Sequence, residues 1–115
     1  MFIDTHCHLD FPEFNQDRGQ VIKRAKDQGI DYIINIGSSL SGSRSCLDLA
    51  HKYDCVYATV GIHPHEADTF ESGQIRILKE LTLDPKVVGI GEIGLDYYRN
   101  YSTVRNQKIM FVSLV

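Results

Sequence analysis

The apolar residues of the chain gather in four short runs, and each run is followed by a stretch with helical spacing. Their apolar and largely β-branched composition, with glycines and polar clusters near the ends, predicts buried strands. The predicted strands are residues 2–5, 30–37, 55–62 and 86–94. The predicted helices are residues 15–28, 44–53, 72–81 and the stretch from 103 onward. We expect Asn15 to cap the first helix, Gly29 to end it, and residues 38–43 to form a loop.

Strands that alternate with helices indicate an α/β fold with a parallel sheet and helices packed on its faces. Two architectures fit this order, a doubly wound open sheet and a (β/α)8 barrel of the TIM type. No G-x-G-x-x-G follows the first strand, so a dinucleotide site has no support. A complete barrel needs about 250 residues, whereas the 115 residues here hold four βα units, or half a barrel.

Composition narrows the choice of partners and compartment. The net charge is −3, so the field of the whole chain does not attract nucleic acid, and any such substrate must be held locally. No apolar run is long enough to span a bilayer, and no secretory signal is visible, so we expect no membrane partner. Three cysteines without framework spacing favour a reducing compartment, namely the cytoplasm, with the nucleus as an alternative. Cys7 is expected to be a buried thiol that points away from its neighbouring histidines.

The unusual polar side chains lie at or just past the ends of the predicted strands. Because parallel strands all end on one side of the sheet, we expect these side chains at one edge, where α/β enzymes place their active sites. They are Asp4, His6 and His8 after the first strand, Ser38 and Ser39 after the second, His63 and His65 after the third, and Glu92 and Asp96 at the fourth.

His6 and His8 are the strongest candidates for metal ligands. Side chains alternate along a strand, so both imidazoles face the same way and can share one divalent cation. Glu92 is expected on the fourth strand, on one face with Val88 and Ile90. A carboxylate there is costly unless it is paired or bound to a metal. We therefore predict a metal site formed by these two histidines and this glutamate, with pairing of the glutamate to an arginine as the alternative.

Other residues of the same edge are candidates for substrate contacts. His63 is predicted to contact substrate, while His65 is either a substrate contact or a structural residue. Arg99 is the cation nearest the acidic edge and a candidate clamp for a phosphate. Asp4 is either a hydrogen-bond partner behind a metal ligand or the cap of a local turn, and Asp96 is also placed behind the ligands. The tyrosines of the same region, Tyr97, Tyr98 and Tyr101, are expected to be packing and rim residues.

Three motifs together resemble the TatD family of metal-dependent deoxyribonucleases. They are D-T-H-C-H-L-D at 4–10, G-I-H-P-H at 61–65 and G-E-I-G-L-D-Y-Y at 91–98. The resemblance implies a (β/α)8 barrel, of which residues 1–115 form a single partial domain. It also implies that His6, His8 and Glu92 bind metal, that Glu92 is catalytic and bridges two ions of Mg, Mn or Zn, and that His63 lies near the scissile phosphate of a DNA substrate.

The chain also departs from the family pattern, in which further metal ligands follow later strands. Gln107 and Phe111 fit a family helix, but Leu114 stands where a second glutamine is expected. We therefore expect a truncated form of a DNA-cleaving metal hydrolase. The alternatives are a small-molecule amide or ester hydrolase and a non-catalytic truncated protein. In each case the open edges of half a barrel could lead to self-association.

Overall fold

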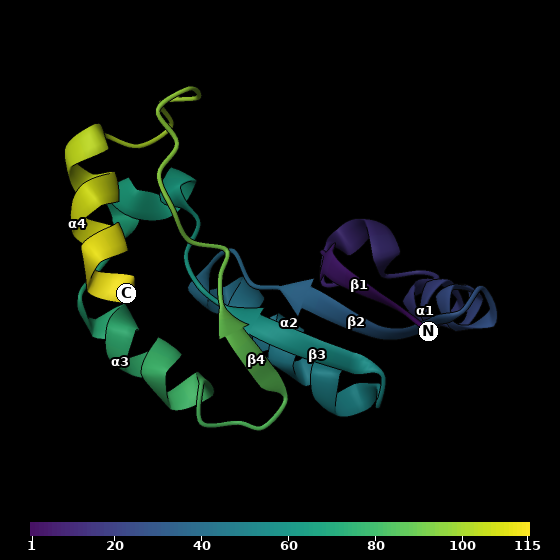
Figure 1. Ribbon diagram of the computed structural model, residues 1–115. Helices are drawn as coiled ribbons and strands as arrows, with labels where there is room; N and C mark the ends of the chain where they lie inside the picture. The colour runs from purple at the N-terminus through teal and green to yellow at the C-terminus, as the bar shows by residue number, and fades with distance from the viewer.

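The computed structural model describes residues 1–115. Four strands alternate with helices, and two short 3-10 helices lie in the loops (Figure 1). The strands are β1 (Phe2–Cys7), β2 (Ile30–Ile36), β3 (Val56–Val60) and β4 (Val87–Ile90). The helices are α1 (Arg18–Asp27), α2 (Leu40–Lys52), α3 (Gly73–Leu81) and α4 (Val104–Leu114), with the 3-10 helices η1 (Pro12–Phe14) and η2 (Pro64–Thr69).

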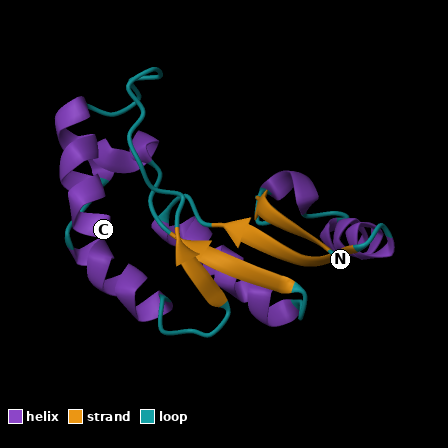
Figure 2. Ribbon diagram, viewed as in Figure 1, coloured by secondary structure: helices purple, strands orange, loops and turns teal.

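The four strands form one parallel sheet in the order β1-β2-β3-β4. Each strand lies beside the strand that precedes it in the chain, and the four arrows point the same way (Figure 2). Their carboxyl ends therefore meet at one edge of the sheet. This arrangement carries the loops after all four strands, and their polar side chains, to a common place.

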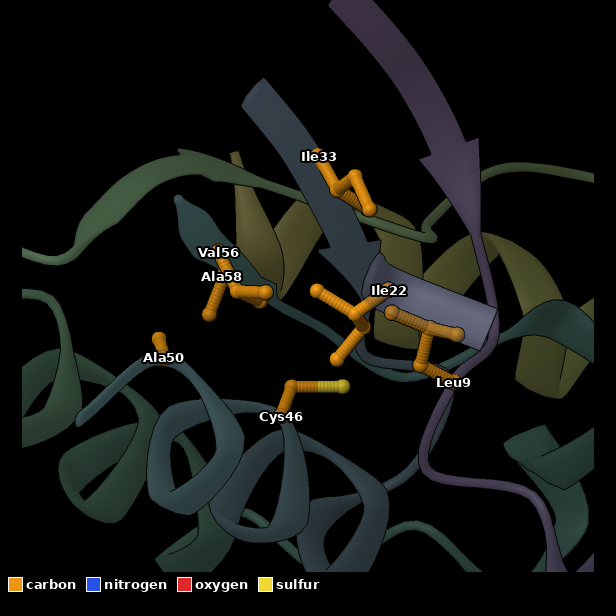
Figure 3. Close-up of a cluster of buried hydrophobic side chains, with 7 residues drawn as sticks. All are labelled: Leu9, Ile22, Ile33, Cys46, Ala50, Val56 and Ala58. Carbon is orange, nitrogen blue, oxygen red and sulfur yellow. The ribbon is translucent and has the colours of Figure 1, made fainter. Parts of the chain in front are cut away.

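One face of the sheet is covered by α1 and α2. The buried side chains between these layers form the main core (Figure 3), made by Leu9, Ile22, Ile33, Cys46, Ala50, Val56 and Ala58. Along β3, buried Val56, Ala58 and Val60 alternate with half-buried Tyr57 and Thr59. The strand thus turns one face to the helices and the other face away from them.

A second core lies beside the carboxyl ends of the strands. It joins β3, η2, α3 and α4 through Val60, Ile62, Ala67, Leu78 and Met110. Helix α4 therefore packs back against η2, which follows β3, although the long loop after β4 separates the two in sequence. This packing fixes both ends of that loop.

Several element boundaries differ from the predicted ones. Helix α1 begins at Arg18 and not at Asn15, because Pro12 starts a separate 3-10 turn. Helix α2 begins at Leu40, since the Ser39 hydroxyl accepts a hydrogen bond from the Gly42 amide and caps the helix, so the predicted loop 38–43 is largely helical.

The strands differ as well. Strand β1 continues to Cys7 and contains His6, whereas β4 ends at Ile90 and stops short of Glu92. None of the helices is long and apolar enough to cross a membrane.

Candidate metal centre

The first two predicted ligands come from the end of β1. His6 is the last residue but one of the strand, and His8 follows directly after it. Their ring centroids are 5.2 Å apart with the rings nearly perpendicular. Cys7, between them, packs against the main core on the helix side of the sheet. The two imidazoles are thus held together while the intervening thiol points elsewhere.

Glu92 reaches the histidines because the chain after β4 crosses the end of the sheet. The amide of Gly91 donates to the carbonyl of Val60 at 3.0 Å, and the amide of Glu92 donates to the carbonyl of Gly37 at 2.5 Å. The Thr59 hydroxyl donates to the carbonyl of Gly91 at 2.7 Å. The segment is therefore tied to the ends of β3 and β2 in succession, and it leans toward β1.

Crossing at this distance requires glycine at position 61. A Cβ atom there would lie 2.6 Å from the carbonyl carbon of Gly91, closer than real Cβ contacts come.

The prediction that Glu92 lies on the fourth strand, on one face with Val88 and Ile90, was wrong, because β4 ends at Ile90. Ile90 lines a cavity with Val60 and Leu78 on the α3 side. Glu92 lies beyond the strand end, where strand alternation no longer sets its direction.

The donor atoms of His6, His8 and Glu92 all lie within 4.8 Å of one another. One carboxylate oxygen of Glu92, Oε2, is 4.0 Å from Nε2 of His6 and 3.9 Å from Nε2 of His8. Two imidazole nitrogens and a carboxylate oxygen form a donor set suited to Zn²⁺, Mn²⁺ and related ions. Atoms that face one another at this spacing, without direct hydrogen bonds, leave room for an ion between them.

The chain also fixes the orientation of the second imidazole. Nδ1 of His8 lies 3.1 Å from the carbonyl of Ile36, where its proton can be donated, and this leaves Nε2 free to bind a cation. The following residue, Leu9, is clamped on both sides. Its amide donates to Oδ1 of buried Asn35 at 2.5 Å, and its carbonyl accepts from Nε of Arg18 at 2.5 Å.

Asn35 was not singled out by the sequence, because it lies inside an apolar run that reads as an ordinary strand. It is fully buried, and its amide group also contacts Asp10 and Cys46 at 2.9 Å. The side chain thus joins β2, α2 and the loop after β1. Its role in holding Leu9 depends on the packing of β2 beside β1, which brings the two residues together.

His63 faces the other oxygen of Glu92. Its Nε2 is 3.7 Å from Oε1, while its Nδ1 accepts a hydrogen bond from the amide of His65. With Nδ1 used as an acceptor, the ring proton of the neutral form lies on Nε2. Burial, and then the neighbouring His65, lower the pKa of His63 below its ordinary value. A neutral ring with a donor at Nε2 is thus presented beside the carboxylate.

His65 is held in a different way, by a hydrogen bond with a carboxylate. Its Nε2 lies 2.5 Å from Oδ2 of Asp96, and the edge of its ring packs against Tyr101 with centroids 4.7 Å apart. Asp96 therefore contacts His65 and none of the three clustered donors. The amide of Arg99 and then His65 hold the pKa of Asp96 down, to about 2.

Asp4 occupies a turn position. Its Oδ1 accepts from the backbone amide of His6 at 3.1 Å, and no imidazole contacts it. This geometry matches the local-turn alternative for Asp4. Burial raises the pKa of Cys7 to about 11, and its side chain packs against the main core rather than beside the two imidazoles.

A cavity of about 270 Å³ opens beside the cluster. It is lined by His8, Phe11, Ser38, Ser39, His63, His65, Glu66 and Glu92. Phe11 and Glu66 were not predicted; Phe11 lies stacked on His8 with ring centroids 4.8 Å apart. An aromatic residue two or three positions after a histidine pair is too common a pattern to have indicated this role. Arg99 does not line the cavity and lies on an exposed loop.

Comparison with known proteins places this arrangement in a family. The sequence profile described as "TatD related DNase" matches residues 3–115. The chain belongs to the TatD related DNase family. The family resemblance read from the three motifs is thereby confirmed.

Curated relatives match almost the whole length of the chain. The 3'-5' ssDNA/RNA exonuclease TatD of Shigella flexneri is 36% identical over 110 residues, which cover 96% of this chain and 42% of the relative. The uncharacterized metal-dependent hydrolase YabD of Bacillus subtilis is 35% identical over 111 residues, with 96% and 44% covered. The chain thus spans about two fifths of the length of these relatives.

Solved structures give the same result for the fold. The TatD homologue YJJV of Escherichia coli K12 superposes with a TM-score of 0.86 at 33% identity, covering 98% of this chain and 44% of that one. A TatD family hydrolase of Entamoeba histolytica gives a TM-score of 0.89 at 27% identity, with the same coverage. The prediction of an α/β fold of TIM-barrel type, with the first four βα units present, is confirmed.

Proposed function

We propose that this chain carries one half of the active site of a divalent-metal-dependent nuclease, and that residues 1–115 form a single partial barrel domain. The observation that carries the proposal is the cluster of His6, His8 and Glu92 at the carboxyl edge of the sheet in a chain of the TatD family. Two relatives' names support the chemistry, since one is a 3'-5' ssDNA/RNA exonuclease and the other a metal-dependent hydrolase. The proposed substrate is single-stranded nucleic acid, DNA in the first instance.

The three clustered side chains hold the ion in this proposal. His6 and His8 each contribute Nε2, and Glu92 contributes Oε2 from the opposite side. These residues would hold a divalent ion, which would supply an activated water and polarise a phosphoryl oxygen. Oε1 of Glu92, which faces His63, would be the carboxylate oxygen left for a second ion in a complete site. We propose Mg²⁺, Mn²⁺ or Zn²⁺ as the resident ions.

The histidines of η2 act on the substrate. His63 carries a ring proton at Nε2 and donates it in a hydrogen bond to a phosphate oxygen of the scissile bond. His65, held by its contact with Asp96, places a second imidazole along the same cavity wall. Arg99 stands farther out and contacts a phosphate of the strand beyond the scissile one.

We also propose that the chain associates with itself and acts in a reducing compartment, the cytoplasm. Strands β1 and β4 each have one neighbour, so two parallel edges are unpaired. Two copies would supply the eight strands that close a barrel. The three cysteines are all free, which fits a reducing environment.

Cleavage of a 5'-end-labelled single-stranded DNA oligonucleotide tests the nuclease proposal. The reaction is run with Mg²⁺ or Mn²⁺, with EDTA, and with the Glu92→Ala variant. A matched control is Glu80→Ala, on the outer helix α3. The expected result is chelator-sensitive cleavage that Glu92→Ala abolishes and Glu80→Ala retains. Cleavage that EDTA does not suppress, or full activity in Glu92→Ala, would contradict the proposal.

A further inference from the structure

The segment between β4 and the second turn of α4 has a composition unlike the rest of the chain. Residues 97–108 read Y-Y-R-N-Y-S-T-V-R-N-Q-K, with three tyrosines, three cations and no carboxylate. The whole chain has a net charge of −3, so this stretch is a local exception. None of its cations, Arg99, Arg105 and Lys108, forms an ion pair with an acidic side chain of the chain. Their charge is available to an outside partner.

The tyrosine loop, residues 97–101, presents its aromatic rings to solvent. Figure 1 shows the connection between β4 and α4 reaching away from the body of the molecule. Tyr98 is 88% exposed, and the guanidinium of Arg99 lies 5.8 Å from the centre of its ring. A tyrosine so exposed contributes no packing to the core. Of the two expected positions for these tyrosines, packing and rim, Tyr98 occupies the rim.

The loop is nevertheless held in one conformation. The carboxylate of Asp96 accepts hydrogen bonds from the amides of Tyr98 and Arg99 at 2.9 and 3.0 Å, and from Nε2 of His65. Buried Gln107 fixes the backbone on both sides of the same residue. Its Oε1 accepts from the amide of Asp96 at 2.7 Å, and its Nε2 donates to the carbonyl of Asp96 at 2.9 Å. A ring presented by so constrained a turn loses little conformational freedom when a ligand binds.

The anchor of the loop also borders the candidate metal centre. Asp96 is bonded to His65, and Tyr101 packs edge-on against the same imidazole at 4.7 Å. His65 lines the cavity that Glu92 and His63 share. A strand whose phosphate enters that cavity would therefore continue past the tyrosine loop.

We propose that the tyrosine loop binds an unpaired nucleobase of the substrate strand, with Tyr98 as the stacking platform and Arg99 on the adjacent phosphate. This inference rests on the proposed nuclease function and names a binding subsite for it. Every base has a flat aromatic face, so stacking on Tyr98 accepts any sequence. Bases within a duplex are already stacked on their neighbours, so the subsite selects single strands. The uncompensated cations supply the attraction to phosphate that the acidic chain as a whole lacks.

Fluorescence anisotropy with a short 5'-fluorescein oligothymidylate tests the subsite. The titration is done in EDTA, so that neither hydrolysis nor a bound ion affects the signal. Tyr98→Ala is expected to weaken binding about 10-fold, equivalent to about 1.4 kcal/mol. Tyr98→Phe keeps the ring and is expected to bind as the wild type does. Arg99→Ala is expected to weaken binding and to reduce its salt dependence, whereas Arg76→Ala, a cation on α3, is the matched control.

A strand of the same length that lacks bases separates stacking from charge. It is expected to bind weakly, and equally to the wild type and Tyr98→Ala. Equal affinity of the wild type and Tyr98→Ala for oligothymidylate would overturn the proposal. The proposal would also be overturned if Tyr98→Ala lost the same affinity for the strand with bases as for the strand without them. Such a result would indicate an effect on charge or folding alone.

The outcomes also separate the subsite from the nuclease function. Base-dependent binding that needs Tyr98, together with cleavage that neither EDTA nor Glu92→Ala affects, would support the subsite and contradict the nuclease. Metal-dependent cleavage with unaltered binding by Tyr98→Ala would support the nuclease and overturn the subsite.

Discussion

Asn35 holds the backbone directly after His8. Its amide group is fully buried and satisfies the backbone N–H of Leu9, directly after the histidine. Buried polar groups of this kind are stabilising when paired and costly when their partner is removed. The side chain therefore links the stability of the core to the geometry of the metal centre.

Replacing Asn35 with Ala should lower both stability and metal affinity. The Leu9 amide loses its partner in a buried place, which costs about 1–3 kcal/mol. The free energy of unfolding, measured with urea, should fall by that amount. Gln20→Ala, at an exposed position of α1, should change it by less than about 0.5 kcal/mol. Equal stability of Asn35→Ala and Gln20→Ala would show that the clamp contributes nothing.

Individual residues were predictable to the extent that local sequence determines their direction. The two-residue spacing at the end of β1 was sufficient to place His6 and His8 near each other, because no long-range contact is needed for that. The partner of Asp96 was not predictable, since His65 lies 31 positions earlier in the chain. Asn35 was missed for the same reason, because its partners belong to other elements.

At the scale of elements, the crossing of the β4 loop over the end of β3 decides where Glu92 lies. Gly61 permits this crossing because the backbone of Gly91 occupies the space that a side chain would take. The constraint joins two motifs, G-I-H-P-H and G-E-I-G, that are distant in sequence. The first motif therefore begins with glycine for a steric reason that lies in the second motif.

Gly61→Ala should displace the Glu92 segment. Overpacking of this kind costs about 1–3 kcal/mol, and the displaced carboxylate should weaken Mn²⁺ binding about ten-fold or more. Gly73→Ala is a matched control, because a Cβ there meets nothing within 4 Å. The measurements are thermal unfolding and a Mn²⁺ titration. Unchanged Mn²⁺ affinity in Gly61→Ala would contradict the assigned role.

The link between the β4 loop and η2 should make stability depend on pH in the acid range. Backbone amides and His65 lower the pKa of Asp96 from 3.8 to about 2, so ionised Asp96 stabilises the fold at neutral pH. That contribution is present above about 3.8 and is lost as pH falls toward 2. Asp96→Asn should have a lower Tm at neutral pH and a weaker dependence of Tm on pH over this window.

Asp68 and Asp84 also have lowered pKa values, but they titrate in the wild type and the variant alike. The difference between the two profiles therefore belongs to Asp96. Parallel profiles for the two proteins would refute the stabilising role of the Asp96 carboxylate.

Element boundaries were less predictable than element types. All four strands and four helices were found in the predicted order, because the apolar periodicity is strong. The predicted start of helix α2, at residue 44, was too late, because the small and polar residues 41–43 are typical of a loop. Strand β4 was extended too far, because an apolar run with glycines does not show where pairing ends.

At the scale of the whole molecule, the chain holds a parallel sheet with helices on one face and two unpaired edges. The other face carries Tyr32 and Tyr57, whose rings pack at 6.0 Å, and Tyr32 is 41% exposed. The fold class followed from the order of the elements. The choice between a barrel and an open sheet came from the family resemblance, because four βα units are compatible with both.

Self-association predicts a dimer that a charge on the open face disrupts. Light scattering coupled to size exclusion should show dimers whose share rises with concentration. Tyr32→Lys should shift the population to monomer, since a charge buried between two sheet faces is costly. Leu83→Lys, at a residue that is 82% exposed in the turn before β4, should leave it unchanged. A monomer at every concentration would exclude the proposed association.

The central claim is that His6, His8 and Glu92 form a site for a divalent ion, and calorimetric titration with Mn²⁺ tests it most directly. The wild type is compared with Glu92→Gln, which keeps the size of the side chain and removes its charge, and with Glu80→Gln on α3 as control. We predict saturable binding that Glu92→Gln weakens by more than about ten-fold and that Glu80→Gln leaves intact. Equal Mn²⁺ affinity in the wild type and Glu92→Gln would contradict the assignment of the site.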